Sequence, residues 1–123
     1  MRLKNNLFFI IDNSISDKEF EFKVRLEKDC TIYNAHFPQN PITPGVCVIQ
    51  IAIELFEENN GCQVEIVKMK NVKFLNLMSP NPMREYIYHF SKLSQEEDTY
   101  KMQVEVTDGE VAYSKMSLTC KEI

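Results

Sequence analysis

The chain has little glycine and no long apolar run, and each shortage excludes a class of protein. Its three glycines are too few and too scattered for the glycine-rich loop that cradles phosphate groups. No apolar run approaches the roughly 18 residues that a membrane-spanning helix requires. We therefore expect neither a nucleotide cofactor nor a membrane span.

Basic residues are too few for a nucleic-acid-binding protein. Fourteen lysines and arginines stand against eighteen acidic residues, and the net charge is −4, whereas nucleic acid recognition needs a strong basic excess. The four cysteines lack Cys-x-x-Cys spacing, and no cluster of Cys, His, Asp and Glu has metal-ligand spacing. The apolar run at residues 7–11 is too short for a secretory signal. The sequence therefore predicts a cytoplasmic protein with reduced thiols, no metal and no nucleic acid partner.

The length and the strand patterns predict one domain that spans residues 1–123. Apolar residues alternate with charged residues over 20–26, which is typical of a half-buried strand. Similar patterns predict further strands within 62–78 and at 86–90, 100–106 and 111–120. In the first of these, the expected inward side chains are Val64, Ile66, Val72, Phe74 and Leu77. The Asp-Gly pair at 108–109 predicts a hairpin between the last two strands.

One segment has the period of a helix, and it begins at Thr43-Pro44-Gly45. Thr43 is expected to be the N-cap, with Pro44 at the first helical position, where no N–H is needed. The Asn-Asn-Gly sequence at 59–61 predicts the end of the helix. Apolar side chains surround almost the whole helix, so we expect it to be central and buried. The sequence thus predicts an α+β fold, in which an antiparallel sheet of about five or six strands wraps one central helix.

Gln50 and Glu54 interrupt the apolar surface of this helix, one turn apart on the same side. Glu57 and Glu58 continue that side toward the end of the helix. Two interpretations stay open for the polar stripe. Either it faces solvent or a wet subunit interface, or its inner members take part in chemistry.

His36 is the first candidate for chemistry outside the helix. It lies in a segment with three of the five prolines, directly before the start of the helix. A single histidine in such a stiff loop is costly to position unless its geometry is used, and histidine is the side chain that exchanges protons near neutral pH.

The motif His36-Phe37-Pro38-x-x-Pro41-x-x-Pro44-Gly45-Val46 resembles the signature of the hot-dog-fold β-hydroxyacyl-acyl-carrier-protein dehydratases. The stretch at residues 71–75 and Pro80 is similar to the family's next strand and its closing proline. The resemblance covers most of the chain and implies a hot-dog fold, with a sheet wrapped around the helix. It also implies a dimer with edge-to-edge sheets, in which His36 of one subunit acts with a helix side chain of the other.

The activity that the resemblance implies is reversible removal of water from a 3-hydroxyacyl thioester of acyl carrier protein or coenzyme A. His36 would be the base, because a neutral imidazole can accept the α-proton near pH 7. The amides of Gly45 and Val46 would bind the thioester oxygen, since first-turn amides are unpaired and lie at the positive end of the helix. Phe37 and Pro44 are expected to contact the substrate.

The sequence departs from the family at the acid. The family's acidic residue, five positions after Gly45, is Gln50 here, and the glutamine that commonly follows four residues later is Glu54. Glutamine can hold a hydroxyl group but has no proton to deliver at neutral pH. Glu54 lies one turn further on, roughly 6 Å away, and could act directly or through a water. Loss of a general acid typically costs about 10²–10⁴-fold in rate.

Four functions therefore stay open. The first is a dehydratase that uses His36 with Gln50 or Glu54, as a homodimer, a heterodimer or a higher oligomer. The second is a weakened hot-dog subunit that pairs with a complete paralogue. The third is a hot-dog thioesterase, and the fourth is a non-enzymatic acyl-binding module. The basic residues Lys68, Lys70, Lys73 and Arg84 are interpreted either as a docking patch for an acidic carrier protein or as a solvated strand face.

Overall fold

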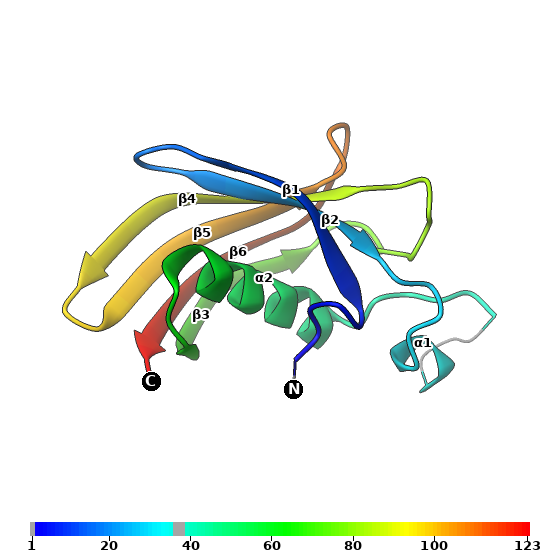
Figure 1. Ribbon diagram of the computed structural model, residues 1–123, viewed down its shortest axis with the longest axis horizontal. Coiled ribbons are helices and arrows are strands. Elements are labelled where there is room, and N and C mark those ends of the chain that lie inside the picture. The colour runs from blue at the N-terminus through cyan, green and yellow to red at the C-terminus, as the bar shows by residue number, and fades with distance from the viewer. Residues whose placement is uncertain (1, 36–38) are drawn as a thin grey trace.

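A curved antiparallel sheet wraps a long helix in the computed structural model, which describes residues 2–35 and 39–123 (Figure 1). Within these ranges the chain forms β1 (Phe8–Ile15), β2 (Phe20–Leu26), α1 (Ile32–Ala35), α2 (Gly45–Asn60), β3 (Val64–Phe74), β4 (Tyr86–Glu96), β5 (Thr99–Thr107) and β6 (Ala112–Glu122). The order across the sheet is β1-β2-β4-β5-β6-β3, so β1 and β3 are the edge strands. This arrangement confirms the predicted α+β architecture.

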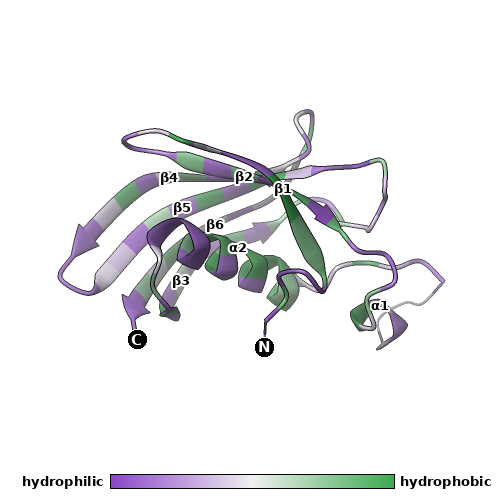
Figure 2. Cartoon of the chain, in the orientation of Figure 1, coloured by the Kyte–Doolittle hydropathy of each residue, from purple (hydrophilic) through white to green (hydrophobic). Residues whose placement is uncertain are grey.

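Helix α2 is buried against one face of the sheet, as its apolar circumference predicts. Its buried side chains are Cys47, Val48, Ile51, Ala52, Ile53, Glu54, Leu55 and Phe56. Figure 2 shows hydrophobic residues along the first turns of α2 and hydrophilic residues in the last turns. The helix ends at Gly61, which has a φ of 71° and donates its N–H to the carbonyl oxygen of Glu57 at 2.8 Å. The predicted helix end is thus confirmed.

The start of α2 differs from the prediction. Pro44 rather than Thr43 is the N-cap, and no side chain caps the helix. The hydroxyl group of Thr43 instead lies 2.8 Å from the hydroxyl of Tyr33, and its N–H donates to the carbonyl oxygen of Met78 at 2.7 Å. Thr43 therefore ties the start of the helix to two distant segments.

Strands β2, β4, β5 and β6 show the predicted alternation. Their side chains toward α2 are buried, namely Phe20, Phe22, Val24, Leu26, Tyr86, Tyr88, Phe90, Met102, Val104, Val106, Met116, Leu118 and Cys120. The β5–β6 hairpin turns at the predicted Asp-Gly pair, where Gly109 has a φ of 98°. On the β3 side the prediction was less accurate, because Phe74 and Leu77 are 52% and 68% exposed instead of buried. All four cysteines are free thiols.

Candidate active site

The first turn of α2 carries backbone donors that the helix does not use. The N–H groups of Cys47 and Val48 donate to the carbonyl oxygen of Pro44 at 2.9 and 3.1 Å. The N–H groups of Gly45 and Val46 precede them and have no acceptor within the described part of the chain. They lie at the positive end of the helix dipole, where an anionic oxygen is stabilised. The side chain of Val46 is 71% exposed, so this turn is open to approach.

An aromatic ring from β3 lies against this turn. A Cβ atom at position 45 would come within 2.8 Å of Cζ of Phe74, so a larger residue than glycine fits there only if the ring moves. Phe74 is half exposed and ends β3. In this structure the close approach that Gly45 permits is therefore that of the Phe74 ring, which partly covers the helix start.

Buried tyrosine hydroxyl groups fix the surroundings of α2. Burial raises the pKa of Tyr33 to about 12, although the hydrogen bond with Thr43 lowers it in part. The hydroxyl of Tyr88 donates to the carbonyl oxygen of Val48 at 3.0 Å, and burial raises the pKa of Tyr88 well above its usual value. Both side chains therefore stay neutral at physiological pH and serve as structural hydrogen-bonding groups.

Gln50 and Glu54 contact each other on α2. The Nε2 atom of Gln50 donates to Oε2 of Glu54 at 3.0 Å. Gln50 is partly buried, whereas Glu54 is only 2% exposed. The contact turns the nitrogen of the Gln50 amide toward Glu54, so it fixes the orientation of the side chain at the family's acid position.

The carboxylate of Glu54 binds the beginning of the chain. Its Oε1 accepts the N–H groups of Leu3 and Lys4 at 3.0 and 2.9 Å, and its Oε2 accepts the N–H of Leu3 at 2.8 Å. The guanidinium of Arg2 lies 3.6 Å from Oε1. Together with the Gln50 amide, these groups surround the carboxylate with donors. Glu54 therefore acts as a hydrogen-bond acceptor inside its own chain.

The polar stripe on α2 thus divides into buried and exposed parts. The interpretation that it faces solvent is wrong for Glu54. Glu57 accepts the N–H of Val64 at 2.9 Å and is partly buried. Glu58 is exposed and pairs with Lys4 at 2.9 Å. Sequence reasoning missed the N-terminal segment that covers Glu54, although the buried apolar residues Leu3, Leu7 and Phe8 were a signal that this segment packs on the core.

The predicted base His36 and the predicted substrate contact Phe37 lie outside the described residues. The structure brings together the helix side of the site, with Pro44, Gly45 and Val46 at the start of α2 and Gln50 one to two turns further on. These groups can bind an anionic oxygen and a hydroxyl group.

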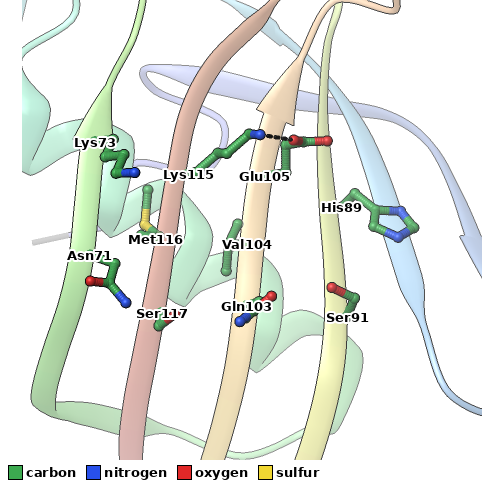
Figure 3. Close-up of a pocket in the computed structure, with 10 residues that line it drawn as sticks. All are labelled: Asn71, Lys73, His89, Ser91, Gln103, Val104, Glu105, Lys115, Met116 and Ser117. Atoms are coloured by element: carbon green, nitrogen blue, oxygen red, sulfur yellow. Dashed lines mark ion pairs between the residues drawn. The ribbon is translucent and has the colours of Figure 1, made fainter.

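The far face of the sheet carries a hollow of about 390 Å³ (Figure 3). Its lining comes from β3, β4, β5 and β6 and is mainly polar, namely Asn71, Lys73, His89, Ser91, Gln103, Val104, Glu105, Lys115, Met116 and Ser117. The sheet separates this hollow from the open turn of α2, so we do not assign the site to it. Among the described residues, no group of three or more His, Cys, Asp or Glu side chains could hold a metal ion. In the same part of the chain, no helix is long and apolar enough to cross a membrane.

The fold and the α2 start together define a hot-dog-fold protein of the dehydratase type. A model of the ApeI-like family, described as ApeI dehydratase, matches residues 12–116. The chain therefore belongs to the ApeI-like dehydratase family. No curated protein sequence matches the chain significantly.

Solved structures show the same fold at low sequence identity. The dehydratase heterocomplex ApeI:P from Xenorhabdus doucetiae is 14% identical, with a TM-score of 0.72 over 92% of this chain and 96% of that chain. A hypothetical thioesterase with coenzyme A from Streptococcus pneumoniae is 11% identical, with a TM-score of 0.65 over 97% of this chain and 90% of that chain. At these identities the likeness supports the fold, and the family match supports the dehydratase class.

Proposed function

We propose that this chain is a dehydratase subunit that acts on 3-hydroxyacyl thioesters of acyl carrier protein or coenzyme A. In this reaction His36 takes the α-proton, and the electrons of that C–H bond form the double bond to the β-carbon. The C–O bond at the β-carbon breaks, and the hydroxyl group leaves as water once it receives a proton. The product is the trans-2-enoyl thioester.

The N–H groups of Gly45 and Val46 are suited to the charge that this reaction creates. Removal of the α-proton places negative charge on the thioester oxygen, and preorganised donors stabilise such charge without rearrangement. Both amides are unpaired within the described chain and lie at an open helix start. The oxygen would therefore sit against the first turn of α2, next to the ring of Phe74.

The contact between Gln50 and Glu54 supports a subunit that lacks its own acid. Gln50 stands at the acid position and has no proton to deliver. The carboxylate of Glu54 is surrounded by the donors of Leu3, Lys4 and Gln50, so we assign it to positioning rather than to proton delivery. We propose that full activity requires a partner subunit that supplies the acid. The similarity to a dehydratase heterocomplex is consistent with this assembly.

A thioesterase is the second candidate function. The fold is shared with a hypothetical thioesterase that has coenzyme A bound. In a hot-dog thioesterase a carboxylate activates water at the thioester carbonyl. The buried position of Glu54, 2% exposed and occupied by donors, argues against that role here.

The decisive experiment compares the wild-type chain with variants that restore the family's arrangement. Purified protein is incubated with a 3-hydroxyacyl-coenzyme A thioester, and enoyl formation and thiol release are followed in parallel. We expect slow dehydration by the wild-type chain. The exchange Gln50→Glu with Glu54→Gln should raise the rate, within the about 10²–10⁴-fold range of a general acid.

Two single variants serve as controls. Glu54→Gln alone should not raise dehydration, because it adds no acid at position 50, and His36→Ala in the exchanged chain should remove the gain. Thiol release without enoyl formation would favour the thioesterase. No increase on the exchange would contradict the proposed loss of the acid at position 50.

A further inference from the structure

Strand β3 leaves one side of the sheet open. It pairs with β6 and is the last strand in the sheet order. An open edge offers backbone N–H and C=O groups to any strand that comes alongside. Val67 and Met69 on β3 are also 54% and 51% exposed. A strand from a second chain would satisfy the backbone groups and cover this apolar surface.

Three lysines of β3, which we call the edge lysines, lie on the face of the sheet that points away from α2. They are Lys68, Lys70 and Lys73. Their register partners on β6 are neutral or basic, namely Thr119, Ser117 and Lys115. Within the described residues none of the edge lysines forms an ion pair with a carboxylate. Figure 3 shows Lys73 beside Lys115 on this face.

Other charges on the same face are paired across strands. Nζ of Lys115 lies 3.4 Å from Oε2 of Glu105, from β6 to β5 (Figure 3). Nδ1 of His89 lies 3.2 Å from Oε2 of Glu21, from β4 to β2. The chain thus supplies carboxylates to charges in the middle of the sheet and supplies none to the edge lysines. The missing carboxylates would have to come from across the open edge.

We propose that the edge lysines select a hot-dog partner chain whose own edge strand carries carboxylates on the same face. This inference rests on the partner subunit in the proposed function. When two hot-dog chains pair edge to edge with both helices on one side of the joint sheet, their outer faces stay together. Two copies of this chain would then bring lysine close to lysine. Like charges across paired strands oppose pairing and opposite charges favour it.

Lysines on an open edge can also hinder strand pairing in general. The two roles predict different responses to a complementary charge. Edge lysines that only protect would reject an acidic strand and a basic strand alike. Edge lysines that select would accept the acidic strand and reject a second copy, and this difference can be tested with the chain itself.

The test mixes the wild-type chain with the variant Lys68→Glu/Lys70→Glu/Lys73→Glu. The two chains carry tags of different mass, and native mass spectrometry counts the two self-pairs and the mixed pair. At low salt we expect the mixed pair to bind at least about tenfold more tightly than either self-pair. The preference should shrink as added salt screens the charges, because the Debye length falls from about 30 Å at 0.01 M to about 3 Å at 1 M.

A matched control reverses three exposed lysines outside β3, in Lys18→Glu/Lys28→Glu/Lys92→Glu. It has the same net charge, and its mixture with wild type should show much less preference. A statistical ratio of pairs in the edge-lysine mixture, or monomers in every mixture, would overturn the proposal. The readout is pairing and not turnover, so it can fail while the dehydratase assays succeed, and the reverse also holds.

Discussion

At the scale of single residues, Glu54 joins the beginning of the chain to the central helix. Its hydrogen bonds reach Leu3 and Lys4, 51 and 50 positions earlier in the sequence. A buried carboxylate needs such donors, since an unpaired charge in the interior is very costly. The same oxygen that accepts the amide of Leu3 also accepts the Gln50 side chain. One residue therefore couples the N-terminal segment to the candidate site.

Replacement of Glu54 by alanine should destabilise the protein. The substitution leaves the buried N–H groups of Leu3 and Lys4 without their acceptor, and each unsatisfied donor costs about 1–3 kcal/mol. Urea unfolding would measure the loss. The control is Glu58→Ala, because the side chain of Glu58 is 46% exposed and surface ion pairs contribute about 0–1 kcal/mol. Equal losses for the two variants would contradict the anchoring role of Glu54.

At the scale of elements, regular periodicity decided what could be predicted. The end of α2 and the alternating strands β2, β4, β5 and β6 follow from local patterns that the structure confirms. The N-cap could not be predicted, because the hydroxyl group of Thr43 bonds with Tyr33 from another segment. The burial of Glu54 was equally hidden, since the segment that covers it is distant in sequence.

Strand β1 shows why a missing pattern conceals an element. Phe8 is its one fully buried residue, and most of the strand is exposed. A bulge between Ile10 and Asp12 shifts the register to β2, so the alternation is interrupted there. The strand exists because it pairs with β2, which is a tertiary contact. The sequence contains no period that would predict it.

The β5–β6 turn should make stability depend on acid pH. Hydrogen bonds from the N–H groups of Val111 and Glu110, and from the hydroxyl of Tyr113, lower the pKa of Asp108 from 3.8 to about 2. Because the folded pKa is the lower one, this stabilisation is complete above 3.8 and is lost as the pH falls toward 2. The stability gap between wild type and Asp108→Asn should therefore shrink over that range, as measured by thermal unfolding.

A companion variant checks the cause of this pH dependence. Tyr113→Phe removes the hydroxyl donor at 2.8 Å and leaves the two backbone donors to Asp108 in place. It should narrow the pH range over which the gap changes. A gap between wild type and Asp108→Asn that stays constant from neutral pH to about pH 2 would show that the carboxylate adds no pH-dependent stability.

At the scale of the whole molecule, the described chain presents one side of a shared site. The open helix start, the amide of Gln50 and the unpaired edge of β3 lie on one chain. The family resemblance led to a correct prediction of the family and the fold, because the motif around the helix start has many fixed positions. The proton donor could not be located by motif alone, since Gln50 and Glu54 are exchanged and their contacts depend on distant residues.

Mixed dimers can test whether His36 and position 50 act across the interface. One chain is wild type, and the other carries His36→Ala and Gln50→Glu together with Glu replacements of the edge lysines, which favour mixed pairing. Alone, the wild type lacks the acid and the variant lacks the base. If the site is shared, the mixed dimer contains one complete site, and its dehydration rate should exceed that of either chain, toward the about 10²–10⁴-fold gain of a general acid. The control variant keeps Gln50 and should give no gain. A mixture no faster than wild type alone, with mixed pairs present in the mass spectrum, would show that the two positions do not act across the interface.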